Sequence, residues 1–172
     1  MSIPTTLLSV SEYLAANYRP DREYVDGELV ERNLGDWDHS RLQGLLLGQL
    51  LKYEDALGFL CVPEQRVQVK ALRFRVPDLC VVRRNPGEQV LRQPPFICVE
   101  ILSPEDSMTS MQERIDDYVA FGIANVWIFD PRRQRAYWAD QSGVHQVQGD
   151  VLMATGAPVR IDLPQLWSRL QQ

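Results

Sequence analysis

The sequence predicts a mixed α/β (α+β) domain, in which helices flank a central sheet of mixed strand direction and a β-hairpin stands near the N-terminus. Two long stretches, residues 37–57 and 108–121, repeat apolar residues at helical spacing. Short apolar or alternating runs between and after them are separated by prolines and glycines, as is typical of strands. A strand–helix–strand order over residues 96–129 favours a parallel strand pair joined by a right-handed crossover.

Size and composition indicate one globular domain over residues 1–172. The chain has 172 residues, of which 45% are hydrophobic and 24% charged, a balance that excludes general disorder. No repeat, low-complexity tract or linker interrupts it. The net charge of −5 argues against a protein that coats nucleic acid. It leaves room for an enzyme that docks DNA through a local basic patch and a bound cation.

The cysteines and the N-terminus bear on where the protein works. The cysteines are odd in number, lack CxxC spacing and lie in apolar runs, so we expect buried, reduced thiols and a reducing, cytoplasmic compartment. They are Cys61, Cys80 and Cys98. The N-terminus has no basic start, so we expect no signal peptide. No apolar run approaches the ~20 residues of a membrane span, so we expect no membrane association.

The first elements are a short helix and a hairpin. Residues 9–18 place apolar side chains near one helical face after a serine cap. Residues 22–32 read as two short strands around Asp26-Gly27, a strong tight-turn signal.

The first long helix begins after Asp36 or Asp38 and ends at Gly58. Gly44 and Gly48 lie one turn apart in it, and we expect them to allow close approach of another element in the core. A membrane role for this GxxxG spacing is not expected in a chain of this composition.

Strands, a second helix and a final hairpin complete the prediction. The second long helix carries Ser110 and Glu113 at capping-box spacing and stops at Gly122. Residues 83–95 form a loop rich in proline, glycine and arginine. Strands are expected at 59–62, 66–70, 79–82, 96–102 and 126–129, a hairpin at 134–140 and 143–148, and a short amphipathic helix at 162–170.

Two acidic residues stand at unusual places in these strands. Asp78 follows Pro77 at the entry to one strand, and Glu100 interrupts another that is otherwise apolar. Ionised carboxylates are rarely buried without a partner, and two on adjacent strands repel each other. A divalent cation removes that penalty, and the carbonyl oxygen of Ile101 can supply a third ligand. The alternative is that Asp78 caps a turn and Glu100 pairs with an arginine.

Ordered segments of the chain resemble the Uma-two family, whose members are described as putative restriction endonucleases of the PD-(D/E)xK nuclease superfamily. The resemblance covers roughly residues 8–140. It rests on SVSEYL, REYVDGELV, the helix start with Asp38, His39 and Ser40, and then PDLCVV, PFICVEILSP, ERIDDY and GIANVWIFDP.

The resemblance implies a restriction-endonuclease-like fold and Mg²⁺-dependent (or Mn²⁺-dependent) cleavage of phosphodiester bonds. Asp78 and Glu100 match the metal-binding acids of the motif, and Glu23 matches a recurring acid of the first hairpin that supports the metal site. DNA is the expected partner. Cleavage of both strands takes two sites, so we expect a homodimer.

One position departs from the superfamily pattern. The motif lysine, two residues after the second acid, is replaced here by Leu102. Family members usually carry a lysine on the following helix instead, where this chain has Arg114 with Tyr118 one turn on. Arginine can bind a phosphate but stays protonated and cannot act as a general base. The alternative for Arg114 is a surface ion pair with Asp117.

Other residues are weaker candidates. His39 matches a recurring family position and can face the substrate cleft, or it can be a helix-end residue without catalytic duty. Gln65 can orient water or phosphate, or serve only as a surface hydrogen-bonding residue. Four arginines near the Asp78 strand are candidate phosphate contacts, or else a solvated face: Arg73, Arg75, Arg83 and Arg84.

Three functions follow from these residues. The first is a metal-dependent DNA endonuclease that uses Asp78, Glu100 and Arg114. The second is an impaired nuclease fold that binds nucleic acid or a protein without cutting. The third is a structural oligomerisation domain, which predicts no affinity for nucleic acid even at low salt.

Overall fold

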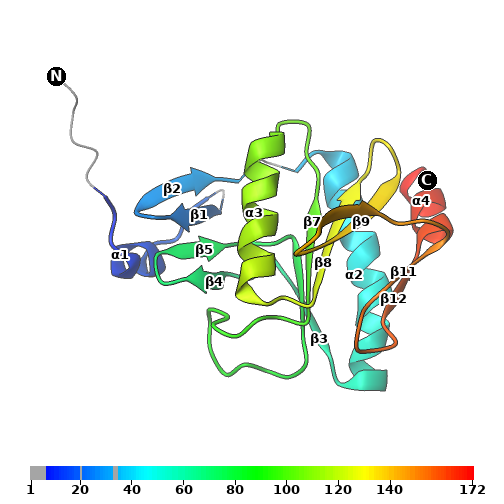
Figure 1. Ribbon diagram of the computed structural model, residues 1–172, viewed down its shortest axis with the longest axis horizontal. Helices are drawn as coiled ribbons and strands as arrows, with labels where there is room; N and C mark the ends of the chain where they lie inside the picture. Colours follow the sequence, from blue (N-terminus) through cyan, green and yellow to red (C-terminus); the bar gives the residue numbers. More distant parts are fainter. Residues whose placement is uncertain (1–6, 20, 33–34) are drawn as a thin grey trace.

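The computed structural model describes residues 7–19, 21–32 and 35–172 (Figure 1). The elements of these residues are, in chain order, α1 (Val10–Ala15), β1 (Arg22–Val25), β2 (Glu28–Glu31), α2 (Trp37–Leu57), β3 (Leu60–Pro63), β4 (Val67–Lys70), β5 (Arg73–Arg75), β6 (Leu79–Val82), β7 (Ile97–Ile101), α3 (Met108–Phe121), β8 (Asn125–Asp130), β9 (Arg135–Asp140), β10 (Gly143–Gln146), β11 (Val151–Met153), β12 (Arg160–Asp162) and α4 (Leu163–Leu170).

The largest sheet is mixed, as predicted. Its strand order is β10-β9-β8-β7-β6-β3, and β7 and β8 run parallel while its other neighbours run antiparallel. The chain between β7 and β8 forms α3, so the expected strand–helix–strand unit is confirmed. A smaller antiparallel sheet, β2-β1-β5-β4, holds the N-terminal hairpin, and β11 pairs with β12 beside α4.

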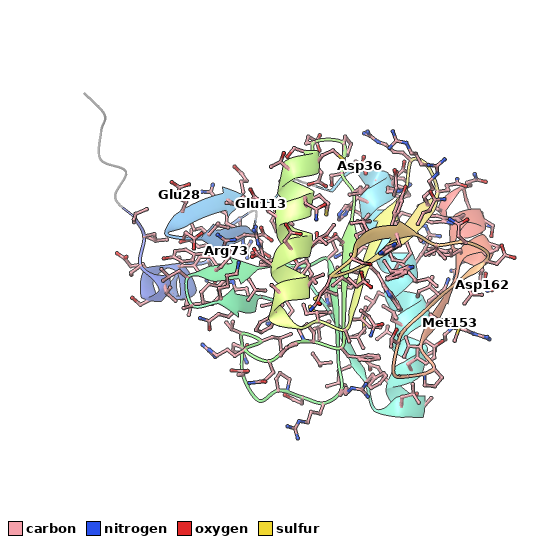
Figure 2. All side chains as sticks on the ribbon, in the orientation of Figure 1. Glu28, Asp36, Arg73, Glu113, Met153 and Asp162 are labelled. Atoms are coloured by element: carbon pink, nitrogen blue, oxygen red, sulfur yellow. The ribbon has the colours of Figure 1, made fainter. Side chains whose placement is uncertain are left out.

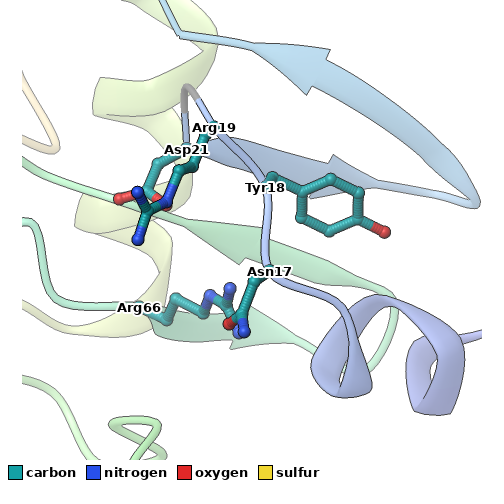
Figure 3. A pocket seen from close by; sticks show the side chains of 5 residues that line it. All are labelled: Asn17, Tyr18, Arg19, Asp21 and Arg66. Carbon is teal, nitrogen blue, oxygen red and sulfur yellow. The ribbon is translucent and has the colours of Figure 1, made fainter.

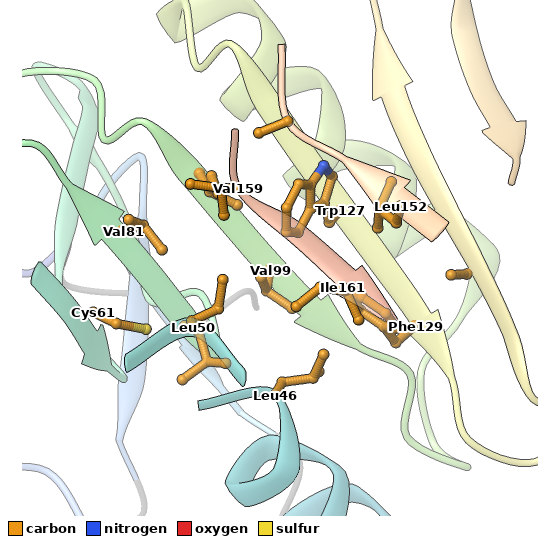
Figure 4. Packing of buried hydrophobic residues seen from close by; sticks show 14 of the residues in the cluster. Leu46, Leu50, Cys61, Val81, Val99, Trp127, Phe129, Leu152, Val159 and Ile161 are labelled. Atoms are coloured by element: carbon orange, nitrogen blue, oxygen red, sulfur yellow. The ribbon is translucent and has the colours of Figure 1, made fainter. Parts of the chain in front are cut away.

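Helices cover both faces of the large sheet. Leu42, Leu46 and Leu50 of α2 pack on one face with Trp127 and Phe129 of β8 (Figure 4). Met111, Ile115 and Tyr118 of α3 pack on the other face with Cys80, Cys98 and Val126. Successive strand residues therefore serve opposite cores, which explains why the central strands read as unbroken apolar runs.

The first long helix has the predicted bounds. The side chain of Asp36 accepts a hydrogen bond from the His39 amide at its start, and Gly58 ends it in the left-handed region at φ 68°. Figure 2 shows Asp36 at that helix end. The expectation for Gly44 and Gly48 is wrong, because both are exposed and no described atom comes within 4 Å of a Cβ placed there. Helical spacing turned them away from the leucine stripe.

The second long helix also has the predicted bounds, but not the predicted cap. Ser107, rather than Ser110, stands at the N-cap, and its hydroxyl accepts from the Ser110 amide at 3.0 Å. The two serines are three residues apart, so the sequence pattern fits either one. Gly122 ends the helix in the left-handed region at φ 92°, as expected.

Several short elements differ from the prediction. The first helix ends at Ala15 rather than at residue 18. Strands β5, β11 and β12 were not predicted, because three residues are too few for an alternating pattern to stand out. The first hairpin is confirmed, with Asp26 and Gly27 both at positive φ (51° and 99°), as its two-residue turn requires.

The three cysteines are buried and free, as predicted. The sulfur atoms of Cys80 and Cys98 lie 3.8 Å apart across the β6–β7 pair, without a bond between them. Within the described ranges, no helix is both long and apolar enough to cross a membrane.

Candidate active site

The antiparallel pairing of β6 with β7 brings Asp78 and Glu100 together. Leu79 pairs with Val99, so the next residues along the two chains, Asp78 and Glu100, stand opposite each other. Residues directly opposite in a sheet project to the same face. Both acids line one small pocket at the strand ends, and its other lining residues are Arg32, His39, Ile101, Ser103, Asp106 and Arg114. This set is called the acid pocket below.

Asp78 is held ionised by its neighbours. It is only 1% exposed, and its Oδ2 accepts a hydrogen bond from the Ile101 amide at 2.7 Å. Its Oδ1 lies 2.5 Å from an Arg32 nitrogen and 3.4 Å from His39 Nε2. Burial by itself would raise the pKa of Asp78, but the His39 bond and the Arg32 charge outweigh it and lower that pKa. The same contact raises the pKa of His39 against its own burial.

The pKa of Glu100 is shifted in the opposite direction to that of Asp78. It is 2% exposed, its Oε1 accepts from the Tyr118 hydroxyl at 2.5 Å, and its Oε2 lies 3.5 Å from Arg114 Nη1. Burial raises the pKa of Glu100 to about 7, with help from the Asp78 charge, although Arg114 and Arg32 oppose the shift. The protein alone therefore leaves the negative charge of Glu100 incompletely compensated at neutral pH.

Arg114 points to the acid pocket from α3. Its guanidinium lies within 4.0 Å of three carboxylates: Asp106 at 3.4 Å, Glu100 at 3.5 Å and Glu23 at 3.7 Å. Arg114 and Tyr118 are one helical turn apart and share this face. The alternative of a surface pair between Arg114 and Asp117 is wrong, because Arg114 is buried and Asp117 pairs with other cations.

Glu23 acts one layer behind the pocket. It is buried in β1, its Oε2 lies 2.7 Å from Arg75 Nη1, and its Oε1 accepts from the Val76 amide at 3.1 Å. Its contact with Arg114 is longer, at 3.7 Å. Glu23 does not line the acid pocket, but its charge acts on Glu100, Arg32 and Arg114, which do.

Two of the arginines expected to contact phosphate are already bound by acids of this chain. Arg75 is 3% exposed and pairs with Glu23 and Asp117, each at 2.7 Å. Arg73 pairs with Asp117 at 3.1 Å and with Asp26. Strand β5 lies between acids of β1 and α3, so its arginines are neutralised inside the fold instead of facing a ligand.

The remaining candidates lie away from the acid pocket. Arg83 and Arg84 follow β6, at the end opposite Asp78, and line a different cavity. The Arg83 guanidinium stacks 4.2 Å from the Phe96 ring centroid. Gln65 donates to the carbonyls of Gln89 and Arg66 and does not line the pocket. A further hollow, near α1, is lined by Asn17, Tyr18, Arg19, Asp21 and Arg66 (Figure 3).

Sequence reasoning missed Arg32, Ser103 and Asp106 of the acid pocket, and Gln43 beside it. Arg32 follows the hairpin and reaches Asp78 across 46 positions of sequence, a distance that no local pattern reports. Asp106 lies between β7 and α3 and contacts Arg114 at 3.4 Å. Gln43 of α2 donates to the Asp78 carbonyl at 2.9 Å. Only the nearness of Asp106 to Glu100 in sequence offered a signal.

The oxygen ligands of the acid pocket suit a hard divalent cation, but Arg32 competes with a cation for Asp78. The two carboxylates and the Ile101 carbonyl are oxygen ligands of the kind Mg²⁺ takes, and Mg²⁺ keeps several waters. The described residues contain no group of three or more His, Cys, Asp or Glu side chains arranged to hold a metal ion. The pocket's free space, about 10 Å³, is roughly that of one water. The uncompensated charge of Glu100 favours a cation, while Arg32 already neutralises Asp78.

Comparison with known proteins now assigns the chain. The sequence model of the Uma2 family, described as "Putative restriction endonuclease", matches residues 10–167. The chain belongs to the Uma2 family. This confirms the resemblance seen in the ordered sequence segments. No curated protein matches this Uma2 chain.

One solved structure supports the fold of this Uma2 protein. A crystal structure described as "a putative nuclease belonging to DUF820", from Anabaena variabilis, superposes with a TM-score of 0.80 at 19% identity and covers 95% of this chain and 99% of that one. The likeness confirms the restriction-endonuclease-like fold. A second structure, a DrdV–DNA complex, reaches a TM-score of only 0.38 at 13% identity, over 77% of this chain and 13% of that one.

Proposed function

We propose that this Uma2 protein is a Mg²⁺-dependent DNA endonuclease, also served by Mn²⁺, that hydrolyses phosphodiester bonds in the acid pocket. The observation that supports it most is the buried pair of Asp78 and Glu100 on neighbouring strands, with the pKa of Glu100 raised to about 7. A fold keeps such a pair at a cost unless a ligand uses it.

The metal-binding residues of this proposal, and the groups that orient them, have distinct roles. Asp78, Glu100 and the Ile101 carbonyl would hold the cation, which when bound would supply an activated water and a positive charge beside the phosphate. The Tyr118 hydroxyl, 2.5 Å from Glu100 Oε1, fixes the orientation of that carboxylate. The Ile101 amide does the same for Asp78 at 2.7 Å.

Arg114 takes the place of the family lysine and changes what that position can do. Its pKa is raised because the charges of Glu100 and Glu23 outweigh its burial, so it stays protonated at every working pH. It can therefore donate hydrogen bonds to phosphate oxygens but cannot accept a proton from water. A bound cation would supply a water of lowered pKa, and Arg114 would bind the phosphate beside it.

The test is nicking of supercoiled plasmid DNA with Mg²⁺ or Mn²⁺. Wild type is expected to nick, and Asp78→Asn to lose at least about 100-fold in rate, since it removes one charged ligand of the metal. Asp55→Asn, an exposed change on the outer side of α2, is the matched control and should act as wild type. Equal residual nicking by wild type and Asp78→Asn sinks the proposal.

A second function is favoured by one observation: an arginine already lies beside each acid, Arg32 at 2.5 Å from Asp78 and Arg114 at 3.5 Å from Glu100. In this alternative the fold binds nucleic acid or a protein without cutting. Absence of Mn²⁺ binding in calorimetry supports it. So does an Arg114→Lys variant that gains cleavage absent from wild type.

A homodimer is part of the endonuclease proposal, because cleavage of both strands takes two sites. Light scattering on the purified protein tests it: twice the mass of the 19.8 kDa chain is expected. A monomer that makes only single-strand nicks would restrict the proposal to nicking.

A further inference from the structure

A groove adjoins the acid pocket. It has a volume of about 520 Å³ and lies between α3 and strands β8 to β10. Ser103 and Asp106 line both the groove and the acid pocket. An extended ligand that reaches Asp78 and Glu100 from this side therefore passes along the groove.

The floor and the rim of this groove differ in chemistry. Met111 and Ile115 of α3 and Ile128 of β8 form a buried apolar floor. The rim carries three exposed arginines within four positions, on the connection from β8 to β9 and the start of β9: Arg132, Arg133 and Arg135. These three residues are called the arginine turn.

The backbone of the arginine turn is preorganised. Asp130 Oδ1 accepts from the amides of Arg132 and Arg133, both at 3.0 Å, and Gln134 takes the left-handed conformation at φ 51°. The Arg133 guanidinium touches Asp130 at 3.1 Å, yet its side chain stays 71% exposed. The Asp130 carboxylate thus orders the backbone of the turn, while all three arginines stay exposed.

The arginine turn differs from the arginines expected to contact phosphate. Arg73 and Arg75 are paired with acids inside the fold. Within residues 7–19, 21–32 and 35–172, no carboxylate lies within 4.0 Å of the guanidinium of Arg132 or Arg135. In a chain of net charge −5, this makes the turn a local concentration of available positive charge beside the candidate site.

We propose that the arginine turn binds the phosphate backbone of the DNA whose phosphodiester bond occupies the acid pocket. This rests on the proposed function and adds the surface that holds its substrate. A guanidinium offers paired donors that match phosphate oxygens, and several close together contact successive phosphates. Such contacts position a duplex without reading its sequence. The apolar floor faces the sugar edge between the phosphates.

The test measures DNA binding without cleavage. Anisotropy of a short labelled duplex is titrated with the protein in EDTA over a range of salt concentrations. The variant is Arg132→Ala with Arg135→Ala, which keeps the Arg133–Asp130 contact and so the turn. The matched control is Arg160→Ala with Arg169→Ala, two exposed arginines away from the groove. Thermal melting verifies that both fold.

The expected result is a loss of at least about tenfold in affinity for the arginine-turn variant, with a salt slope smaller by about 2, one for each phosphate contact. The control should stay within about twofold of wild type. Wild-type affinity in the arginine-turn variant, an equal loss in the control, or no DNA binding by wild type at low salt overturns the inference.

Failure of this inference and failure of the nuclease proposal are distinguishable. If Asp78→Asn nicks plasmid as wild type does while the arginine-turn variant loses affinity, the catalytic assignment fails and the DNA surface stands. If nicking depends on Asp78 but the arginine-turn variant binds normally, the nuclease proposal stands and the surface lies elsewhere.

Discussion

Two ionic clusters of this protein, one around Asp117 and one around Glu100, differ in their balance of positive and negative charge. In one, Asp117 is bound by three cations: Arg75 at 2.7 Å, Lys70 at 2.8 Å and Arg73 at 3.1 Å. Burial would raise the pKa of Asp117, but its bonds from Lys70 and Arg75 lower it. In the acid pocket, Glu100 lies 3.5 Å from Arg114, and its pKa is raised to about 7.

We call the Asp117 cluster closed, because its acid is fully paired with cations, and the Glu100 cluster open, because its acid is not. Asp117 has more cationic donors than it needs, which is the arrangement expected of a structural element. Glu100 shares its cation with Glu23 and Asp106 and faces the charge of Asp78. Acids and arginines therefore stabilise the fold around Asp117, whereas around Glu100 they leave negative charge that a cation could compensate.

The largest effect is expected from a substitution that breaks the closed cluster. Asp117→Asn should lower the free energy of unfolding by about 3–5 kcal/mol, because it leaves buried Arg75 with one acid instead of two. At pH 5, where folded Glu100 is still protonated, Glu100→Gln should change it by less than about 1 kcal/mol, since it keeps an acceptor for Tyr118. Urea unfolding of both variants measures this. Equal destabilisation contradicts the distinction.

The pH dependence of stability sharpens the comparison. A raised pKa means that folded Glu100 keeps its proton while the unfolded chain loses it, so stability falls as pH rises from 4.5 to about 7. Asp117 has a lowered pKa, so its contribution is lost only as pH falls below 3.8.

The measurement is urea unfolding of wild type and Glu100→Gln across this pH window. The decline in wild type should exceed that in the variant by roughly 1–3 kcal/mol. The contact with Asp78 and the charge of Glu100 also raise the pKa of His39 against its burial, so His39 lowers stability as pH rises above 6.5. The two proteins are therefore compared between pH 4.5 and 6.5, where Glu100 titrates and His39 does not. Identical pH profiles contradict the assignment.

The smallest expected effect concerns Arg32, which competes with a cation for Asp78 at 2.5 Å. Arg32→Ala should tighten Mn²⁺ binding severalfold, because removing a nearby positive charge lowers the repulsion of the metal. Arg84→Ala is the control for a lost exposed arginine and should bind as wild type. Weaker Mn²⁺ binding in Arg32→Ala would show that Arg32 assists the site instead of competing.

The sequence predicted the helices and strands of this fold better than the ion pairs between residues distant in sequence. Both long helices have their predicted bounds because leucine stripes and glycine stops are local signals. Asp78 and Glu100 were found because an acid in an apolar strand is itself a local anomaly. Arg75 was misjudged because the acids that bind it, Glu23 and Asp117, are 52 and 42 positions away in sequence. Arg32 was missed for the same reason.

The most direct measurement of the central claim is calorimetry with Mn²⁺ on four proteins: wild type, Asp78→Asn, Glu100→Gln and Asp117→Asn. If Asp78 and Glu100 form an open site, wild type and Asp117→Asn bind the ion with similar affinity, while Asp78→Asn and Glu100→Gln lose binding. Failure of wild type to bind, or unchanged binding in Glu100→Gln, would contradict the account.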